Sequence, residues 1–423
     1  MGIKIHEYAN EAFQINDEDF YDVDYWNGAS YESRKISGAT LKSELSGGSG
    51  GRFGIADTNG VYTYYTTLTA AMTAAVSGQT IEMFADVTET GAVSVNLKNG
   101  VNLNLNGHTY TLNNSSTNDA ITDNSVTLSC TIFNGTIQRS GGTSSPVDST
   151  ALAIKGASKI TLQGAVIRST FGCAAYIVGE VVGGHYIGSA PGGLSLFVPG
   201  IIRNASFYSS NGTARIDNLA QDCTFRSDGS YAVLANSTNT RLINCVGFST
   251  SSYGIYNSGV LINSTGFSTA SDGIYNVGQI RNSAGYSTAG IGIFAFGSCE
   301  NSSGISTVSY GILGSGNAKL YNCHSESSAQ AALFTQGYVY GCTVVSTWNN
   351  ANGHAITGGT IAYKDIFNCV LEVTNASANC LYWGAAISCK YGANTFKGAT
   401  TPVNANITQG MINIEDAQGN ITI

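Results

Sequence analysis

A 19-residue repeat constrains the fold of this chain more than any other feature. Four copies follow one another from Leu242, and they read LINCVGFSTSSYGIYNSGV, LINSTGFSTASDGIYNVGQ, IRNSAGYSTAGIGIFAFGS and CENSSGISTVSYGILGSGN. A helical hairpin repeat needs roughly 30 residues or more and helix-forming composition, which this unit lacks. The spaced leucines of leucine-rich repeats and the heptads of coiled coils are also missing. The unit fits one coil of a parallel β-helix, built from three short strands and their turns.

Stacked coils dictate what each repeat position holds. Coils lie about 4.8 Å apart, so each position lies above its copy in the next coil, and inward positions must be apolar. We expect two inward columns, Ile255, Ile274, Ile293, Ile312 and Phe248, Phe267, Tyr286, Ile305. A third column is glycine, at Gly254, Gly273, Gly292 and Gly311. It predicts either a turn with positive φ or a close approach of neighbouring backbones.

Asparagine also recurs in one register, at Asn244, Asn263, Asn282, Asn301 and Asn322. Two interpretations are open. A ladder inside a turn would satisfy buried amides along the stack, whereas an exposed row of amides would serve a ligand. We favour the ladder, because buried amides must find hydrogen-bond partners.

The position after asparagine alternates between Cys and Ser. Its members are Cys223, Cys245, Ser264, Ser283, Ser302, Cys323, Cys342 and Cys369. We interpret this column as a place for a small, compact side chain. Metal binding is the alternative, but the Ser residues interrupt any thiolate cluster, and no CxxC motif or zinc spacing occurs. We therefore expect no metal and no cofactor.

The segment ahead of the repeat predicts a helical cap and carries a family resemblance. TTLTAAMTAAVSG reads as a helix over 66–77, which can cover the open end of a solenoid. The succession LTAAMTAAVSGQTIEMFADV and VNLNLNGHTYTLNN, with later INC or IxN elements, resembles the pectate-lyase-like right-handed parallel β-helix proteins over 60–398. The resemblance implies an all-β, right-handed parallel β-helix solenoid of roughly 14–15 coils. That family includes polysaccharide lyases and hydrolases, bacteriophage tailspikes and fibres, and adhesins.

The first 46 residues differ from the repeat. They hold nine acids and four bases, and a linker over 47–59 follows, with the flexible stretch SGGSGG at its start. We expect a strand over Phe20–Trp26, an Asn-Gly turn and a second strand over Ser30–Ile36. A lone hairpin is marginally stable, so it should dock or trimerise. The segment resembles the modules that anchor tailed-bacteriophage fibres and spikes to the virion, although its acid run fits a solvated hairpin face equally well.

Several partners are disfavoured by composition. The net charge of −8, without a basic stripe, argues against nucleic acid. The sequence contains no run of about 18 apolar residues, so we expect no membrane span. The first ten residues do not read as a signal peptide. We therefore expect reduced thiols made in a cytoplasm. The stretch 399–423 leaves the repeat, and we expect it to form strands, with turns at Gly410 and Gly419, that cap the last coil or join a subunit interface.

Few acids are available for catalysis. A β-helix that cleaves polysaccharides needs carboxylates or a basic residue in a groove. The catalytic candidates are Asp217, Asp222 and Asp228, with Arg215 and Arg226 close in sequence. Solvated turn carboxylates are the alternative. Asp365 with Glu372 is a second pair, whereas Arg281 and Glu300 share a column and predict a surface ion pair.

Outward aromatic residues form the candidate binding surface, at Tyr253, Tyr256, Tyr275, Phe294 and Tyr310. Three of them directly follow the inward Ile column, so alternation turns them outward. Such a row either stacks on sugar rings or is buried between subunits. We favour the subunit interface, because a large apolar patch needs a partner. The resemblance adds that β-helix fibres are commonly homotrimers.

These observations and the resemblance together predict a structural virion protein of a tailed bacteriophage. It would be a fibre or spike that attaches to other virion proteins through 1–46 and mediates adhesion to host-surface polysaccharide. It would be assembled in the host cytoplasm and reside in the virion. One alternative is a polysaccharide depolymerase tailspike, acting as a glycoside hydrolase or lyase. Another is a capsid or tail decoration protein that binds no ligand. We favour a protein without enzymatic activity.

Overall fold

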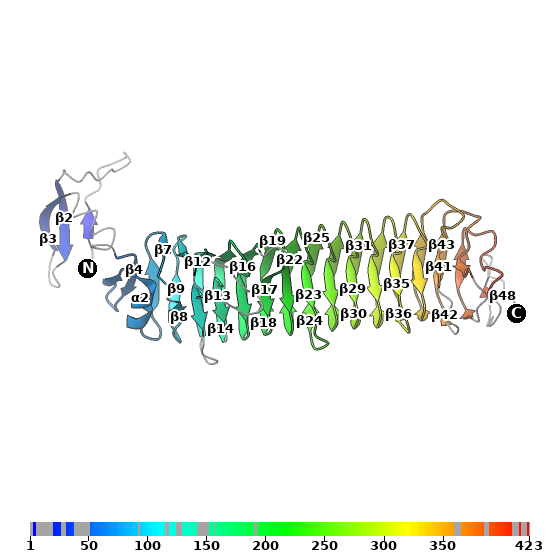
Figure 1. The fold of residues 1–423 in the computed structure, drawn as a ribbon, viewed down its shortest axis with the longest axis horizontal. Helices are drawn as coiled ribbons and strands as arrows, with labels where there is room; N and C mark the ends of the chain where they lie inside the picture. Colours follow the sequence, from blue (N-terminus) through cyan, green and yellow to red (C-terminus); the bar gives the residue numbers. More distant parts are fainter. Residues whose placement is uncertain are drawn as a thin grey trace. The chain divides into compact units, whose positions relative to one another are not determined.

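A computed structural model describes this chain in two compact units, Met1–Tyr186 and Ile187–Ile423. It describes 51–407 except 92–93, 114, 116–117, 124–128, 142–151, 157, 190–192, 359–364 and 385–388, together with strand backbone at 3–5, 20–26, 31–37, 414–415 and 421–422. Both units contain coils of a parallel β-solenoid, about 14 turns counted along the chain (Figure 1). The predicted all-β solenoid class is confirmed.

The first unit begins with a three-stranded antiparallel sheet. Its strands are β1 (Ile3–Ile5), β2 (Phe20–Trp26) and β3 (Tyr31–Ser37). β2 pairs with both neighbours, and β2 and β3 match the two strands expected from the sequence within one residue. The Asn-Gly turn between them lies outside the described residues.

The linker predicted over 47–59 contains a paired strand, which corrects its boundary. β4 (Phe53–Ala56) pairs antiparallel with β5 (Tyr62–Tyr65) and β6 (Thr80–Met83). Phe53 and Ile55 are buried. The alternation of apolar residues after the Gly-Ser stretch therefore produces a strand instead of a tether.

The helix expected over 66–77 is shorter in the structure, where α2 spans Leu68–Ala74. Thr67 is its N-cap, because its side chain accepts a hydrogen bond from the Ala70 N–H at 3.2 Å. The chain leaves helical geometry at Ala75, whose ψ is 145°. The helix contacts β4, β5 and β8 (Val95–Asn96).

The other strands of the first unit form coils. They are β7 (Val87–Glu89), β9 (Asn102–Asn104), β10 (Thr109–Asn113), β11 (Ile121–Asp123), β12 (Ser129–Ser140), β13 (Ile154–Gly156), β14 (Lys159–Ser169) and β15 (Ala175–Ile177). The chain passes into the second unit within β16 (Glu180–Gly188). Val95, Ile121 and Ile154 pair in register and are fully buried, so they form one inward column of this unit.

In the second unit each coil gives one strand to each of three faces, which we call A, B and C. Face A holds β17 (Leu194–Val198), β20 (Thr213–Ile216), β23 (Val233–Ala235), β26 (Ile255–Asn257), β29 (Ile274–Asn276), β32 (Ile293–Ala295), β35 (Ile312–Gly314), β38 (Leu333–Thr335), β41 (Ile356–Thr357) and β44 (Leu381–Tyr382). Face B holds β18 (Ile201–Arg203), β21 (Leu219–Gln221), β24 (Arg241–Ile243), β27 (Val260–Ile262), β30 (Gln279–Arg281), β33 (Ser298–Glu300), β36 (Lys319–Tyr321), β39 (Tyr338–Tyr340), β42 (Asp365–Phe367) and β45 (Lys390–Gly392).

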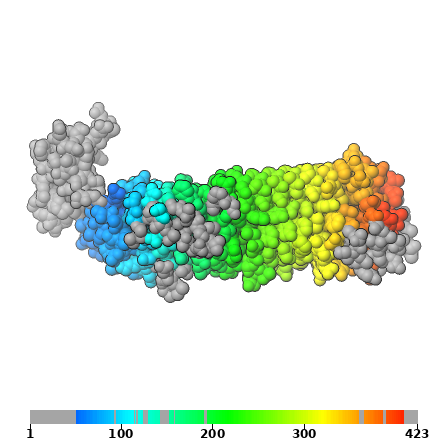
Figure 2. All heavy atoms as spheres, in the orientation of Figure 1, coloured from blue at the N-terminus to red at the C-terminus, as the bar shows by residue number. Residues whose placement is uncertain are grey.

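Face C holds β19 (Ser206–Ser209), β22 (Thr224–Ser227), β25 (Val246–Ser249), β28 (Thr265–Ser268), β31 (Ala284–Ser287), β34 (Ser303–Ser306), β37 (His324–Ser327), β40 (Thr343–Ser346), β43 (Val370–Val373) and β46 (Thr395–Lys397). Within each face, successive strands pair in parallel. Figure 2 shows these coils packed directly against one another. The chain ends with the antiparallel pair β47 (Ile414–Glu415) and β48 (Ile421–Thr422). Gly410 and Gly419, where turns were expected, lie outside the described residues.

One predicted inward column is confirmed and the other is wrong. Ile255 and its copies are fully buried. Phe248 and its copies are half-buried and face outward, because Gly247 and Ser249 take the inward positions of β25. A Cβ on Gly247 would lie 2.4 Å from the Gly254 carbonyl oxygen, so this part of the coil has no room for an inward side chain.

Left-handed backbone occurs in the Asn column and not in the Gly column. The φ angles of Asn244 and its copies through Asn322 lie between 50° and 54°. Asn tolerates this conformation better than most residues, and Asp222 and Gly341 take the same register for the same reason. Gly254 instead marks a close approach, because a Cβ there would lie 2.5 Å from the Phe267 carbonyl oxygen.

The Asn ladder exists, but at the surface instead of inside a buried turn. The Nδ2 of Asn301 donates to Oδ1 of Asn282, and Nδ2 of Asn322 donates to Oδ1 of Asn301, each at 3.3 Å. These side chains are exposed. The buried amide pair is elsewhere, where Asn257 Nδ2 donates to Asn276 Oδ1 at 2.7 Å. Across the described residues, no helix has the length and apolar composition needed to cross a membrane.

Candidate functional site

The three candidate catalytic acids lie in three different turns. Asp217 follows β20 and accepts two hydrogen bonds from Arg215, at 2.9 Å and 3.0 Å. Asp222 follows β21 at a left-handed position and accepts a bond from Asn244 Nδ2 at 2.8 Å. Each of these two carboxylates therefore already serves a local partner.

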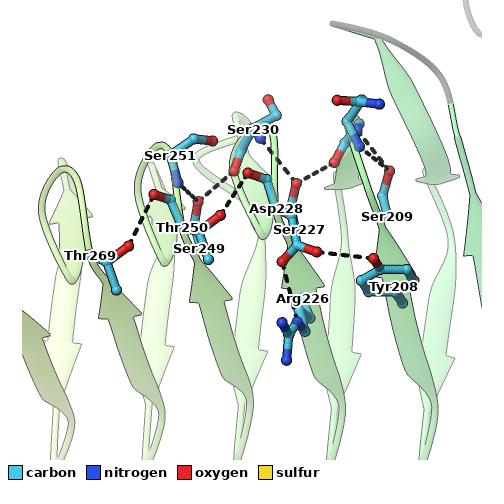
Figure 3. A network of polar contacts seen from close by, with 12 residues as sticks. Tyr208, Ser209, Arg226, Ser227, Asp228, Ser230, Ser249, Thr250, Ser251 and Thr269 are labelled. Atoms are coloured by element: carbon cyan, nitrogen blue, oxygen red, sulfur yellow. Dashed lines mark hydrogen bonds and ion pairs between the residues drawn. The ribbon is translucent and has the colours of Figure 1, made fainter.

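Asp228 follows β22 and belongs to a network at the edge of face C (Figure 3). It accepts hydrogen bonds from the Tyr208 hydroxyl at 2.9 Å and from Arg226 Nε at 3.3 Å. The Arg226 guanidinium also lies 5.2 Å from the centroid of the Phe248 ring, a cation–π distance. This carboxylate thus orients an arginine against an aromatic ring.

The second acid pair is separated in the same way. Asp365 accepts a hydrogen bond from the Tyr340 hydroxyl at 3.2 Å, whereas Glu372 lies 3.9 Å from Lys397 Nζ. The expected surface ion pair is confirmed, with Arg281 Nε 3.4 Å from a carboxylate oxygen of Glu300. Inverting hydrolysis needs two carboxyls facing each other across a groove. The contacts of these acids tie each to its own donor instead.

Four of the five aromatic residues selected from the sequence meet on face A. The Tyr256 and Tyr275 rings are 5.1 Å apart with planes at 8°, and the Tyr275 and Phe294 rings are 4.8 Å apart at 18°. Tyr253 lies 5.1 Å from Tyr275. We call the whole cluster the face A patch, and its members are Tyr231, Tyr253, Tyr256, Tyr275, Phe294 and Phe296.

The stacking in the face A patch determines what it offers to a partner. Tyr275 has one ring stacked on each side, so both of its faces are already covered. A sugar that packs its C–H groups on an aromatic ring needs a free ring face. The column instead presents ring edges, which an apolar surface of another chain can cover, and hydroxyls, which can form hydrogen bonds to that chain.

A groove of about 290 Å³ follows face C. One wall is the outward column Phe248, Phe267, Tyr286 and Ile305, and the other contains Ser268, Thr269, Ser287, Thr288 and Thr307, so the lining is mainly apolar with hydroxyls along one side. The Phe267 and Tyr286 rings stack at 5.0 Å. Sequence reasoning missed this groove, because it placed the Phe248 column inside the solenoid.

Hydroxyl groups repeat along this groove. The Oγ1 of Thr269 donates to the Thr250 carbonyl, that of Thr288 to the Thr269 carbonyl, and that of Thr307 to the Thr288 carbonyl, each at 3.0 Å. The hydroxyl oxygens keep lone pairs that can accept further hydrogen bonds. Buried serines support the same turns, as Ser249 does by donating to the Ser230 carbonyl at 2.6 Å (Figure 3).

Tyr310 is separate from the face A patch and lines a pocket of about 300 Å³. The other lining residues are Gln330, Ala331, Trp348, Asn352, His354, Thr357 and Tyr382. The His354 ring stacks on Tyr382 at 3.9 Å. Burial raises the pKa of Tyr310 and lowers the pKa of His354, so both side chains are neutral at pH 7. The sequence selected only Tyr310 from this pocket.

Asp272 has the most unusual environment among these carboxyls. It takes the repeat position that Tyr253 and Tyr310 hold in other coils, and it is only 9% exposed. Burial raises the pKa of Asp272 to about 6. Burial and this nearby carboxyl also raise the pKa of Tyr253. The signal in the sequence was an acid in a column that is otherwise aromatic or aliphatic.

The column that alternates between Cys and Ser has a structural role. Ser264 Oγ donates to the Ile262 carbonyl at 2.8 Å, and Cys245 Sγ donates to the Ile243 carbonyl at 3.4 Å. Both bonds reach the carbonyl two residues earlier, so the two residue types are interchangeable here. All ten cysteines are buried, free thiols. In the part of the chain that the structure describes, no three His, Cys, Asp or Glu side chains gather as metal ligands.

Three surfaces therefore stand out in the second unit: the face A patch, the face C groove and the Tyr310 pocket. The face A patch and the face C groove are mainly apolar, although the Asp272 carboxyl lies beside the patch and the Arg226 network lies at one end of the groove. The Tyr310 pocket combines aromatic rings with amide and hydroxyl groups. Comparison with protein-family models, with curated proteins and with solved structures found no match to this chain.

Proposed function

We propose that this chain is a fibre or spike protein of a tailed bacteriophage that adheres to glycans on the host surface. The phage context rests on the resemblance of 1–46 to virion attachment modules and of 60–398 to β-helix tailspikes and fibres. The parallel solenoid fits such proteins. In this proposal the right-handed coils carry the adhesive surface, and 1–46 binds other virion proteins.

The face C groove is the observation that carries the adhesion proposal. Each coil along it supplies one apolar side chain, such as Phe267 or Tyr286, and one hydroxyl, such as Thr269 or Thr288. Stacked coils repeat this pair at a constant spacing of about 4.8 Å. A linear polysaccharide also repeats C–H groups and hydroxyls, so successive sugar units can lie along the apolar side chains of this column and meet one hydroxyl in each coil.

Binding of host-cell polysaccharide to the immobilised protein tests the proposal. We expect Phe267→Ala and Tyr286→Ala each to weaken binding at least tenfold, because each removes part of the apolar wall. Tyr321→Ala is the matched control, since this Tyr is half-buried on face B and stacks on Tyr340 at 5.6 Å. Equal binding by all three variants and the wild type would refute adhesion through the groove.

Self-association belongs to the same proposal. The face A patch presents ring edges whose faces are already covered, and its flank includes Phe296, which is 39% exposed. Burying this strip against a second and third copy would remove the apolar surface from water. We therefore propose a homotrimer in which the patch lies at the subunit interface.

The depolymerase and decoration alternatives make different demands. A depolymerase needs two cooperating carboxyls, and Asp217, Asp222 and Asp228 have separate partners in separate turns. This separation supports binding over cleavage. A decoration protein needs no binding groove, so the periodic face C groove supports adhesion over decoration.

A further inference from the structure

The Tyr310 pocket lies where the repeat breaks. Ile293 follows Ile274 by 19 residues, whereas Ile356 follows Leu333 by 23. The longer coil contains the loop 347–353, and two of its residues, Trp348 and Asn352, line the pocket. The break thus adds a wall that the regular coils lack.

This loop is held in place by its own contacts. The Asn350 N–H donates to the Trp348 carbonyl, and the Gly353 N–H donates to the Asn350 carbonyl, each at 2.8 Å. A Cβ on Gly353 would lie 2.4 Å from the Trp348 carbonyl oxygen, so glycine permits the tight closure. Asn375 Nδ2 in the following coil donates to Asn349 Oδ1 at 3.3 Å. The wall is therefore a defined structure.

Two columns each have a small residue between two rings at this point. Ile312 pairs with Leu333, and Leu333 pairs with Ile356. The residues two positions before these three paired residues form the column Tyr310, Ala331 and His354. The neighbouring outward column runs Phe334, Thr357, Tyr382 in the same way. Small residues therefore stand at adjacent positions between larger rings.

The spacing of the coils sets the width of the gap. Residues two coils apart in a column are separated by about twice 4.8 Å, which leaves room for one further ring between them. In the face A patch that room is filled by the next aromatic side chain, as Tyr275 does between Tyr256 and Phe294. At Ala331 the column supplies no ring, and the Tyr310 ring lies 5.4 Å from the Phe334 ring of the neighbouring column, so only part of this room is open.

The lining of the gap matches an uncharged, hydroxyl-bearing ring. His354 Nδ1 accepts a hydrogen bond from the Asn379 N–H at 3.0 Å, so the proton of the neutral ring is on Nε2. Gln330 and Asn352 add amide donors and acceptors. Among its described lining residues there is no Asp, Glu, Lys or Arg. A buried carboxylate or ammonium on a ligand would therefore lack a charged partner.

We propose that the Tyr310 pocket binds one neutral pyranose unit of a glycan. The C–H faces of the sugar would pack between Tyr310, Trp348 and the His354–Tyr382 stack, and its hydroxyls would meet the amides and the imidazole. The volume of about 300 Å³ is at the lower end of small-molecule sites, roughly 300–1,000 Å³, and suits a single unit more than a chain. The inference rests on the proposed function only in taking a carbohydrate as the ligand.

Saturation-transfer NMR on the full chain tests this site directly. The probes are methyl α-mannopyranoside, methyl β-galactopyranoside, methyl N-acetyl-β-glucosaminide and, as the charged counterpart, methyl glucuronide. We expect at least one neutral glycoside to receive saturation and the glucuronide to receive none. Ala331→Phe puts a protein ring into the gap and should abolish the signal. Trp348→Ala should weaken binding at least tenfold.

Two further variants separate a lost site from a lost fold. Gln330→Ala removes an exposed side chain and should weaken binding while leaving the thermal midpoint unchanged. Tyr321→Ala, outside the pocket, should bind like the wild type. The pocket proposal is overturned if no neutral glycoside binds, if the glucuronide binds best, or if Ala331→Phe binds normally.

The polysaccharide assay with the groove variants keeps the two proposals distinguishable. Pocket variants that lose the glycoside but retain the polysaccharide would leave adhesion through face C intact. A wild-type chain that binds a neutral glycoside but no host polysaccharide would support the pocket and refute adhesion.

Discussion

The side-chain carboxyl of Asp272 accepts a hydrogen bond from the backbone N–H of Ile291 across 2.8 Å while almost wholly removed from solvent. Its pKa is raised to about 6 because burial disfavours the ionised form. An aspartate in the unfolded chain titrates near pH 3.9. Between about pH 4 and pH 6 the folded state therefore holds more protons than the unfolded state. Stability must fall as the pH rises through this window.

Asp272→Asn should remove that pH dependence. The amide oxygen can still accept from the Ile291 N–H, but the side chain no longer ionises. The groups that face it, Tyr253 and Tyr275, have pKa values raised above 10 and stay neutral in this window. We expect the variant to be more stable than the wild type at pH 7 by about 2–3 kcal/mol and nearly equal at pH 4. Urea unfolding at several pH values measures the difference, and a constant difference across the range would contradict it.

The left-handed Asn column predicts different effects of alanine and glycine on stability. Asn282 has a φ of 50°, so Asn282→Ala should cost about 1 kcal/mol, whereas Asn282→Gly should be close to neutral. Ala393 has the same φ of 50° and already bears that strain. Ala393→Gly should therefore raise the thermal midpoint. A lower midpoint for Ala393→Gly would argue against backbone strain at this position.

Crowding in the Gly column predicts a large loss of stability from a single methyl group. A Cβ on Gly273 would lie 2.4 Å from the backbone nitrogen of Tyr286, which cannot move without disturbing the next coil. We expect Gly273→Ala to cost about 3 kcal/mol or more. Gly384→Ala is the control, because a Cβ there has no atom within 4 Å. Similar midpoints for the two variants would mean that the coils are less tightly packed than this spacing requires.

The face A patch predicts a change of oligomeric state. Tyr275→Ser removes the central ring of the stacked column, and with it the apolar edge that a second subunit would cover. We expect the wild type to sediment as a trimer and Tyr275→Ser to dissociate at least partly into monomers. Tyr321→Ser on face B should remain trimeric. A monomeric wild type would remove the patch from any subunit interface.

The sequence predicted the solenoid because the repeat position that fills the core holds the same residue type from coil to coil. Ile255 and its copies are inward in every coil, and the 19-residue period follows from them. Which residues of a face C strand point inward could not be predicted in the same way. β25 has four residues, and either Phe248 or Gly247 satisfies a period of two. Only the closeness of the Gly254 carbonyl to Gly247, which is a three-dimensional fact, turns Phe248 outward.

The candidate sites show the same limit. Asp217 and Asp222 are close in sequence, but strand β21 separates their turns, and each bonds to a local partner. The break in the repeat before Ile356 was visible in the sequence. Its consequence was not, because the gap beside Ala331 depends on residues from three consecutive coils, including Tyr310 and His354.

Incubation of the purified protein with host-surface polysaccharide, followed by sizing of both the bound and the free material, tests the central claim most directly. Adhesion without cleavage predicts that the polysaccharide binds and keeps its full length, and that Phe267→Ala releases it. The release of oligosaccharides, abolished in Asp217→Asn or Asp222→Asn, would contradict this account and identify a depolymerase.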